Sequence, residues 1–376
     1  MSYDLVIHGG TVIDPASGLH ARRDVAISGD RIAAVEAHIL LDEATDVIDA
    51  TDRLVVPGLV DLHVHVYWGV ADLAIKPGPN DLARGATTIV DAGSAGANTF
   101  PGFRDYVINA FPGRILAFLN ISLMGQIDPF LGELHDLRYA IAERAAACAR
   151  ADTGTIVGIK VRLGEELTGP NAIPALERAV EAGWAADVPV MVHIGDSTAT
   201  TEQIMERLRP GDIVTHAFTD RRNGIFDDRG RVHAAALEAR RRGVIFDVGH
   251  GAGSFSFRRA EAALAEGFRP DTISSDLHRL NVDGPVFDLV TTLSKFLHLG
   301  LGVDEVIAMA TTEPAAAIGR AGTVGTLTSG AVADVAILSL EEGNYRFTDS
   351  LGVTVTGRQR LAPVATIRAG KRVPDR

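Results

Sequence analysis

Short apolar runs alternate with turn residues at both ends of the chain. Near the start, DLVIHGG, TVIDPASG and DVAISGD each place a few apolar residues beside Gly, Pro or Asp. The same pattern returns late in the chain, in TVGTLTSGAVADVAILSL and LAPVATIRAGKRV. Runs of this kind are typical of strands joined by tight turns. We therefore expect residues 1–54 and 321–376 to combine into one small β-sandwich.

Between residues 55 and 320, strand-like apolar runs alternate with helical stretches rich in Ala, Arg and Glu, such as RVHAAALEARRR. This alternation predicts parallel strands with crossover helices. Eight runs recur at close to the ~30 residues of one strand-plus-helix unit. Each is marked by a residue near its C-terminal end: His63, Asp91, Asn120, Lys160, His193, His216, Gly249 and Asp276. The expected fold is α/β, with a (β/α)8 TIM barrel over residues 55–320.

The charge balance excludes one class of partner. The chain has 36 Lys+Arg against 48 Asp+Glu, a formal net charge of −12, which argues against a nucleic-acid surface. No apolar run reaches the roughly 18 residues that a membrane helix needs. Asp4 also stands where a signal peptide would carry basic and then apolar residues. We expect a cytoplasmic protein with no nucleic-acid or membrane partner, and a homo-oligomer stays open.

Polar residues end several of the predicted strands, and in a barrel these ends meet at one mouth. The segment DLHVHV places His63 and His65 on the same face of the first strand, since side chains alternate with period two. His193, His216 and Asp276 end later strands. Imidazole and carboxylate suit zinc or a similar divalent ion. Four histidines and one carboxylate exceed one tetrahedral site, so two ions are expected, with zinc as the expected metal.

Lys160 is an unexpected residue for such a site, because an ammonium group repels cations. A neutral lysine amine can add carbon dioxide and become a carbamate, an N6-carboxylated lysine. Its two anionic oxygens could bridge ions roughly 3.5 to 4 Å apart. The predicted metal ligands are His63, His65, Lys160, His193, His216 and Asp276.

The order of these ligands along the chain resembles that of the amidohydrolase superfamily with a binuclear metal centre. The segments VVPGLVDLHVHV, TTEPAAAIG and GTLTSGAVADVAIL are also similar to that superfamily. Because SSDLH follows a segment like FDVGHG, the chain most resembles the amidohydrolase/deacetylase group, which is dihydroorotase-like. The resemblance implies a metal-dependent deacetylase that acts on ester or amide bonds of small carboxylates, such as an acetylated α-hydroxy acid or an N-acyl amino acid.

The expected mechanism is attack by a metal-bridging hydroxide, with Asp276 as the catalytic general acid and base. Two divalent ions, a carbamate, Asp276 and a hydroxide sum to a formal charge of about +1, which favours an anionic substrate. A small-molecule carboxylate is therefore the expected partner.

Four further residues are candidates for substrate binding. Arg162 should share the face of Lys160 and could pair with a carboxylate through its planar fork, or form a salt bridge at the barrel rim. His250 and His278 could donate hydrogen bonds to substrate or to a developing oxyanion, or have structural roles. Tyr67 could line the mouth. Asp91 could orient a metal-bound imidazole.

Two alternative functions are weighed against the deacetylase. A cyclic amide hydrolase of the dihydroorotase or hydantoinase kind is the nearest, but dihydroorotases typically have Arg two residues after the second histidine of HxH, where this chain has Tyr67. The other is a non-catalytic barrel scaffold. Such proteins usually lose ligands, so retention of all the positions, Asp276 in particular, favours an enzyme.

Overall fold

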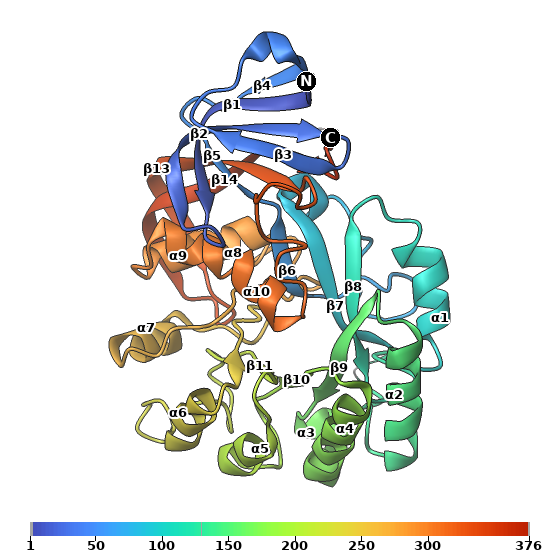
Figure 1. The fold of residues 1–376 in the computed structure, drawn as a ribbon. Helices are drawn as coiled ribbons and strands as arrows, with labels where there is room; N and C mark the ends of the chain where they lie inside the picture. The colour runs from blue at the N-terminus through green and yellow to red at the C-terminus, as the bar shows by residue number, and fades with distance from the viewer. Residues whose placement is uncertain (1–2, 129, 375–376) are drawn as a thin grey trace.

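The computed structural model describes residues 3–128 and 130–374. Figure 1 shows a sheet built from the two ends of the chain, in blue and red, above a larger region of strands and helices. The two regions contain separate hydrogen-bonded sheets, one of eight strands and one of seven. The fold is therefore mixed α/β, as the sequence predicts.

The eight-stranded sheet combines both ends of the chain. Its strands are β1 (Tyr3–Asp14), β2 (Leu19–Ser28), β3 (Arg31–Glu36), β4 (Ala44–Asp49), β5 (Leu54–Pro57), β13 (Val335–Thr348), β14 (Thr354–Arg368) and β15 (Lys371–Arg372). They run in the order β15-β14-β13-β5-β1-β2-β3, with β4 paired to β1. The short strand β5 joins the two halves, because it pairs in parallel with β1 and antiparallel with β13. The division at residues 54 and 320 stays a prediction.

Apolar side chains from both halves hold this sheet together. Val12, Val25, Val55, Val335 and Ile367 are buried and belong to one hydrophobic cluster. β-Branched residues suit such a pleated, buried surface. The sheet is thus stabilised by contacts between segments that lie far apart in the sequence.

The seven-stranded sheet is parallel throughout, and its strands lie in chain order. They are β6 (Leu59–Val64), β7 (Ala86–Gly96), β8 (Arg114–Asn120), β9 (Ile156–Arg162), β10 (Val190–His193), β11 (Ile213–Thr215) and β12 (Ile245–Phe246). Every residue of β6, β7 and β9 is buried. Burial on both faces is expected for parallel strands, which are covered by crossover helices.

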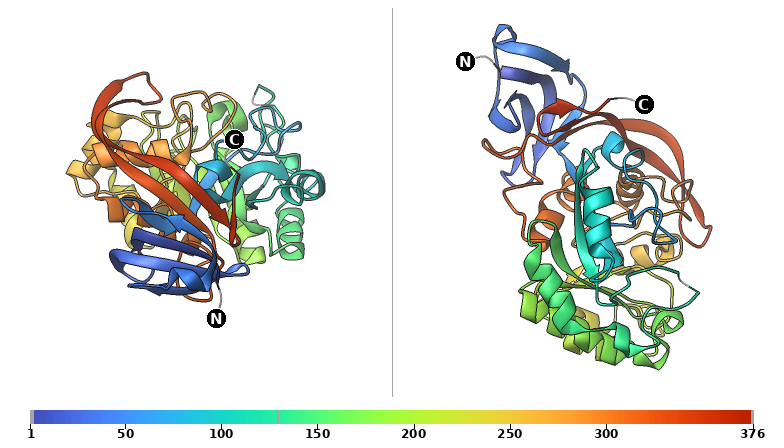
Figure 2. Two further views of the ribbon diagram at one scale, coloured as in Figure 1. Left: turned by 90° about the horizontal axis from the view of Figure 1, so that it is seen from above. Right: turned by 90° about the vertical axis from the view of Figure 1, so that its right-hand side faces the viewer.

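Ten helices follow or separate these strands in the described part of the chain. They are α1 (Phe100–Phe103), α2 (Ala142–Ala151), α3 (Glu165–Thr168), α4 (Ala172–Ala186), α5 (Thr201–Arg207), α6 (Ala234–Arg241), α7 (Phe257–Ala265), α8 (Leu289–His298), α9 (Val303–Ala308) and α10 (Thr312–Ala317). Short 3-10 turns lie at Leu41–Glu43, Leu82–Arg84, Leu137–Tyr139 and Gly169–Asn171, and a π-helical turn lies at Arg104–Ile108. The buried faces of α2 and α4 are mostly alanine, so these helices pack together closely outside β9 (Figure 2).

The predicted eighth strand is not a regular strand. Residues 272–277 make only two isolated parallel bridges, Asp247 with Thr272 and Val64 with Leu277. These bridges link the segment to β12 on one side and β6 on the other, so the parallel sheet is curled. Asp276 has a left-handed backbone conformation with a φ of 48°, which is incompatible with a continuous strand.

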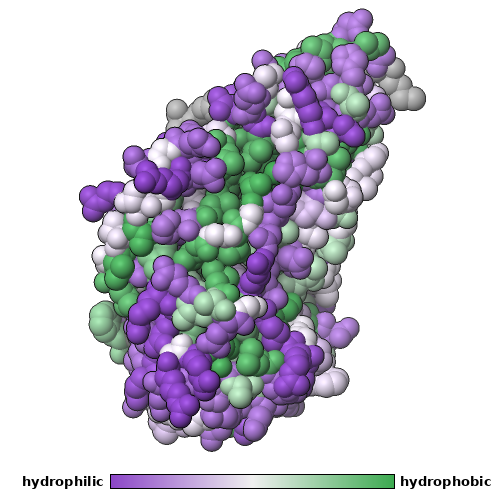
Figure 3. All heavy atoms as spheres, turned by 90° about the vertical axis from the view of Figure 1, so that its left-hand side faces the viewer, coloured by the Kyte–Doolittle hydropathy of each residue, from purple (hydrophilic) through white to green (hydrophobic). Residues whose placement is uncertain are grey.

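No helix in the described ranges is long and apolar enough to span a bilayer. On the face of the molecule drawn in Figure 3, hydrophilic residues surround smaller hydrophobic areas.

Candidate metal centre

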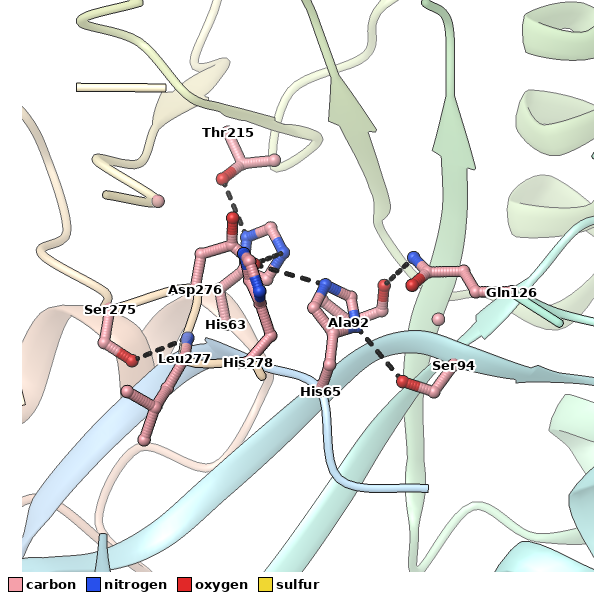
Figure 4. A network of polar contacts seen from close by, with 12 residues as sticks. His63, His65, Ala92, Ser94, Gln126, Thr215, Ser275, Asp276, Leu277 and His278 are labelled. Carbon is pink, nitrogen blue, oxygen red and sulfur yellow. Dashed lines mark hydrogen bonds and ion pairs between the residues drawn. The ribbon is translucent and has the colours of Figure 1, made fainter. Parts of the chain in front are cut away.

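The structure brings the six predicted metal ligands together at the C-terminal ends of the parallel strands. His63 lies in β6 and His65 directly follows it, Lys160 lies on β9, His193 ends β10, His216 follows β11, and Asp276 lies in residues 272–277. Nε2 of His63 and Nε2 of His65 lie 3.4 and 3.2 Å from Asp276 Oδ1 (Figure 4). The rings of His193 and His216 are 4.3 Å apart between centroids.

The hydrogen bonds of two histidines leave their Nε2 atoms free to bind a metal. His63 Nδ1 lies 3.0 Å from Thr215 Oγ1, and the Thr215 hydroxyl donates its proton to Asp247 at 2.7 Å. His63 Nδ1 must therefore be the donor to Thr215. His216 Nδ1 donates to the carbonyl oxygen of Gly249 at 2.7 Å. Each neutral ring thus keeps a lone pair on Nε2, the form that binds a metal.

Burial keeps these imidazoles neutral. It lowers the pKa of His65 to about 3 and that of His216 to about 4, and it lowers the pKa of His63 and His193 well below the usual range. At neutral pH the rings therefore offer lone pairs rather than positive charges.

The carboxylate of Asp276 lies close to the ligand nitrogens of two histidines. One ligand atom each from His63, His216 and Asp276 lies within 4.8 Å of the others. Oδ1 of Asp276 is buried, and among the described residues it has no hydrogen-bond partner. A buried carboxylate oxygen without a partner is costly. A divalent cation would offset that cost, so the donor set fits a metal ion.

Lys160 lies beneath this group and is fully buried. Its Nζ is 3.4 Å from His63 Nε2. Burial lowers the pKa of Lys160 to about 7, although the charge of Asp276 opposes this shift. Gly93, with a φ of 90°, makes room for the side chain, because a Cβ there would lie 2.7 Å from both Cβ and Cγ of Lys160. The amine is thus held in place and is partly neutral near pH 7.

Two buried carboxylates, Asp91 and Asp61, accept hydrogen bonds from residues next to the metal ligands. Asp91 accepts hydrogen bonds from the backbone of Val66 and Ser94, and the Ser94 hydroxyl lies 3.1 Å from His65 Nδ1. Ser94 therefore lies between Asp91 and the imidazole that Asp91 was expected to orient. Asp61 accepts from the backbone of Ser275, and burial raises the pKa of Asp61 to about 7.

A cavity of about 160 Å³ opens onto the ligands. Its lining residues are His63, His65, Leu73, Arg162, Glu166, His193, His216, Arg221, Ala252, Gly253, Ser254, Asp276 and His278. We call it the catalytic cavity.

Two of the substrate-binding candidates line the catalytic cavity. Arg162 is also ion-paired with the buried Glu133, to which Nε donates at 2.5 Å, so of its two predicted roles the salt bridge is present, inside the protein. His278 Nδ1 accepts from the backbone N–H of Leu280 at 3.2 Å. Since burial lowers the pKa of His278 to about 4, the neutral ring carries its proton on Nε2. His278 is therefore a hydrogen-bond donor.

A comparison with protein families identifies the group to which this site belongs. The profile of the amidohydrolase family matches residues 54–373. The chain belongs to the amidohydrolase family. It is accordingly an enzyme, a metal-dependent hydrolase of amide or ester bonds, and the scaffold alternative was wrong.

Individual relatives of this amidohydrolase have different names. Deacetylase Atu3266 of Agrobacterium fabrum (strain C58 / ATCC 33970) is 37% identical over 331 residues, which cover 88% of this chain and 81% of the relative. The crystal structure of an adenine deaminase aligns over 100% of both chains with a TM-score of 0.93 and 32% identity. That of a dihydroorotase covers 98% of this chain and 97% of the other, with a TM-score of 0.90 and 34% identity. The shared fold alone does not select a substrate.

Tyr67 and His250 lie elsewhere in this amidohydrolase than the sequence suggested. The Tyr67 hydroxyl donates to the carbonyl of Thr99 at 3.0 Å. His250 is fully buried, with Nε2 2.7 Å from Lys295 Nζ. Neither residue is among the described residues that line the catalytic cavity. The reason is physical: both side chains find hydrogen-bond partners inside the protein, which a count of positions past a strand end cannot reveal.

Sequence reasoning overlooked Glu133, Glu166 and Arg221. Glu133 pairs with Arg162, and the other two line the catalytic cavity of this amidohydrolase. Arg221 lies in the loop THAFTDRR, directly after a predicted strand end. Because loops at that end of a barrel carry the substrate contacts, its position was a usable signal. The position of Glu133 gave no comparable signal, because its loop is long and irregular.

Proposed function

We propose that this amidohydrolase removes an acyl group from a small carboxylate, such as an acetylated α-hydroxy acid or an N-acyl amino acid. The observation that carries the proposal is the convergence of His63, His216 and Asp276 beside the catalytic cavity. The name of Deacetylase Atu3266 supports an acyl group as the part that is removed.

The proposed centre holds two divalent ions, with zinc as the proposed metal. Its ligands would be His63, His65, Lys160, His193, His216 and Asp276. Bound ions of this kind supply an acidified water and a Lewis acid for the scissile carbonyl. Lys160 would act as a carbamate, formed when its neutral nitrogen bonds to the carbon of CO2 and releases one proton. The pKa of about 7 supports this step, because the neutral amine is accessible near physiological pH.

Two side chains would take part directly: Asp276 would transfer a proton, and His278 would stabilise the oxygen of the scissile carbonyl. Asp276 accepts the proton of the attacking water and returns it to the departing alkoxide or amine. Its buried Oδ1, which has no hydrogen-bond donor among the described residues, supports this role. Nε2–H of His278 donates to the oxygen of the scissile carbonyl as negative charge develops there.

The proposed arrangement requires the parallel sheet to close on itself. We propose that residues 272–277, although not a regular strand, occupy the position of the eighth strand of a (β/α)8 barrel. Their bridges to both edges of the sheet support this, as does the hydrogen bond from the His65 N–H to the Leu277 carbonyl at 3.0 Å. Closure would bring ligands from distant segments to one rim.

A substrate screen with metal analysis tests the proposed function. Purified, zinc-supplemented protein is assayed on acylated α-hydroxy acids, N-acyl amino acids and cyclic amides, and its metal content is measured. We expect hydrolysis of acylated carboxylates. Asp276→Asn keeps a ligand oxygen but removes the proton acceptor, so it should retain much of its metal and lose turnover. Hydrolysis confined to cyclic amides would contradict the proposal.

A further inference from the structure

The catalytic cavity is small for a complete substrate. Its volume of about 160 Å³ is well below the ~300 Å³ at which ligand pockets usually begin. A second cavity of about 610 Å³, which we call the outer cavity, is lined by residues that include Thr200, Asn223 and Phe226. Arg221 lines both cavities. Arg221 therefore lies between the two cavities, and a substituent too large for the catalytic cavity would reach the outer cavity past it.

Arg221 is held in position from both sides. A Cβ at Gly195 would lie 3.1 Å from Arg221 Cβ, and a Cβ at Gly253 would lie 2.9 Å from Arg221 Nη2. Nε donates to the carbonyl of Gly253 at 3.2 Å, and Nη1 donates to Asp196 at 2.7 Å. The side chain thus passes between the loops that follow β10 and β12. Such preorganisation lowers the entropy cost of binding a ligand.

One nitrogen of the Arg221 guanidinium remains available to donate hydrogen bonds to a ligand. Within residues 3–128 and 130–374, Nη2 of Arg221 has no hydrogen-bond partner. The Arg221 side chain is 45% exposed and its ion-pair partner Asp196 is 32% exposed, so this pair is open to a ligand in a way that a buried pair is not. It also lies close enough to the ligands to act on His193, whose pKa is lowered by burial first and then by neighbouring cations that include Arg221.

Arg162, the other arginine of the catalytic cavity, has a different environment. Two of its nitrogens contact one oxygen of Glu133, and both side chains are almost fully buried. The second oxygen of Glu133 accepts from Asn120 at 3.1 Å. The charge of Arg162 is therefore balanced inside the protein, and loss of Arg162 would leave a buried carboxylate without its counterion.

We infer that Arg221 binds the substrate carboxylate where the two cavities meet, with the acyl group in the catalytic cavity and the substituent on the α-carbon in the outer cavity. This inference rests on the proposed function, because it assumes an acylated carboxylate as substrate. It assigns charge recognition to Arg221 and a structural role to Arg162.

The test compares a carboxylate with its uncharged analogue. O-acetyl-lactate and O-acetyl-lactamide share the scissile ester and differ only in the charged group. Arg221→Gln should lower kcat/KM for O-acetyl-lactate about 30-fold, the lower end for removal of a charge-paired partner, since the site is partly exposed. The rate on the lactamide reports whether the variant is folded, and the preference for the carboxylate should vanish. Arg221→Lys keeps the charge without the planar fork and should be intermediate.

Two matched variants complete the design. Arg229→Gln removes an exposed arginine of the same loop that lines neither cavity, and it should change neither rate by more than about twofold. Arg162→Gln should lower both rates together. The inference is overturned if Arg221→Gln keeps the preference or lowers both rates equally, or if Arg162→Gln alone removes the preference. A wild-type enzyme that hydrolyses neither these probes nor any other acylated carboxylate of the substrate screen would instead overturn the proposed function.

Discussion

Lys160 and Lys295 both lie fully buried, and their surroundings differ. Burial lowers the pKa of both Lys160 and Lys295 to about 7. Lys295, on α8, contacts three acceptors: His250 Nε2 at 2.7 Å, the Pro285 carbonyl at 2.9 Å and the Thr348 carbonyl at 2.8 Å. Lys160 contacts one imidazole nitrogen at 3.4 Å.

The comparison shows that burial and a lowered pKa do not by themselves mark a reactive amine. Lys295 is hydrogen-bonded to three separate segments of the chain. These contacts surround its nitrogen, so it cannot bond to carbon dioxide or bind a metal ion. Lys160 is equally buried but has one long contact and faces a group of metal ligands. Partner number, rather than pKa, separates the structural lysine from the one proposed to be carboxylated.

The largest expected effect is on catalysis at Lys160. Lys160→Ala should lose metal and lower kcat/KM by about 10³-fold, since a metal centre supplies several kcal/mol to the transition state. Short carboxylic acids such as acetate should restore part of the activity by supplying the missing oxygens. The exposed Lys76 is the control, and Lys76→Ala should retain full activity. Full activity in Lys160→Ala would rule out the bridging role.

A smaller effect, on stability, is expected at Lys295. Lys295→Met leaves three buried acceptors without a donor, so the free energy of unfolding should fall by about 3 kcal/mol. Lys160→Met removes only one long contact and should cost less than about 1 kcal/mol in chelator-treated protein. Urea denaturation of both variants at neutral pH measures the difference. Equal losses would show that partner number does not distinguish the two lysines.

The pH dependence of stability sharpens the same point. The pKa of Lys295 is 10.5 in the unfolded chain and about 7 in the folded protein. Between these values the unfolded chain binds a proton that the folded protein does not, so the free energy of unfolding rises with pH. Below about pH 7 both states are protonated and the dependence disappears.

The measurement is the difference in unfolding free energy between wild type and Lys295→Met. It should grow by about 1.4 kcal/mol from about pH 7.5 to about pH 8.5. Groups common to both proteins cancel in the difference. A difference that stays flat or shrinks over this range would contradict the assignment of a lowered pKa to Lys295.

The smallest expected effect concerns the space around Lys160. Gly93→Ala places a methyl group 2.7 Å from Lys160 Cβ and Cγ, so the amine must move, and activity should fall about tenfold, as for other residues that orient metal ligands. Gly211 has a similar φ of 86° but nothing within 4 Å of a Cβ. Gly211→Ala should therefore add backbone strain without changing the activity. Equal activities for the two variants would show that Lys160 tolerates displacement.

The regular elements of the fold could be predicted because their signals are local. The seven parallel strands follow from long apolar runs, and the ligands at their ends follow from the shared direction of parallel strands. Residues 272–277 are different. The hydroxyl of Ser274 donates to Asp247 and the backbone of Ser275 donates to Asp61, and such bonds compete with a regular ladder.

The hydrogen-bond partners of buried side chains were harder to predict than the position of the site. Lys295 stands in LVTTLSKFLH, where it resembles a solvated helix residue. It is buried only because Thr348 and Pro285 approach it from other parts of the chain. Tertiary contacts of this kind also explain why His250 and Tyr67 do not line the catalytic cavity. Local pattern carries no information about partners that distant segments supply.

The short strand β5 has a consequence for how the molecule is made. It precedes β6, which carries His63, yet one of its two neighbours is β13, near the other end of the chain. During synthesis, one edge of β5 therefore stays unpaired until at least residue 335 has been made, and pairing over such a sequence separation is slow. Nascent chains released before residue 335 should hold β5, and the metal-binding strand that follows it, only through the pairing with β1.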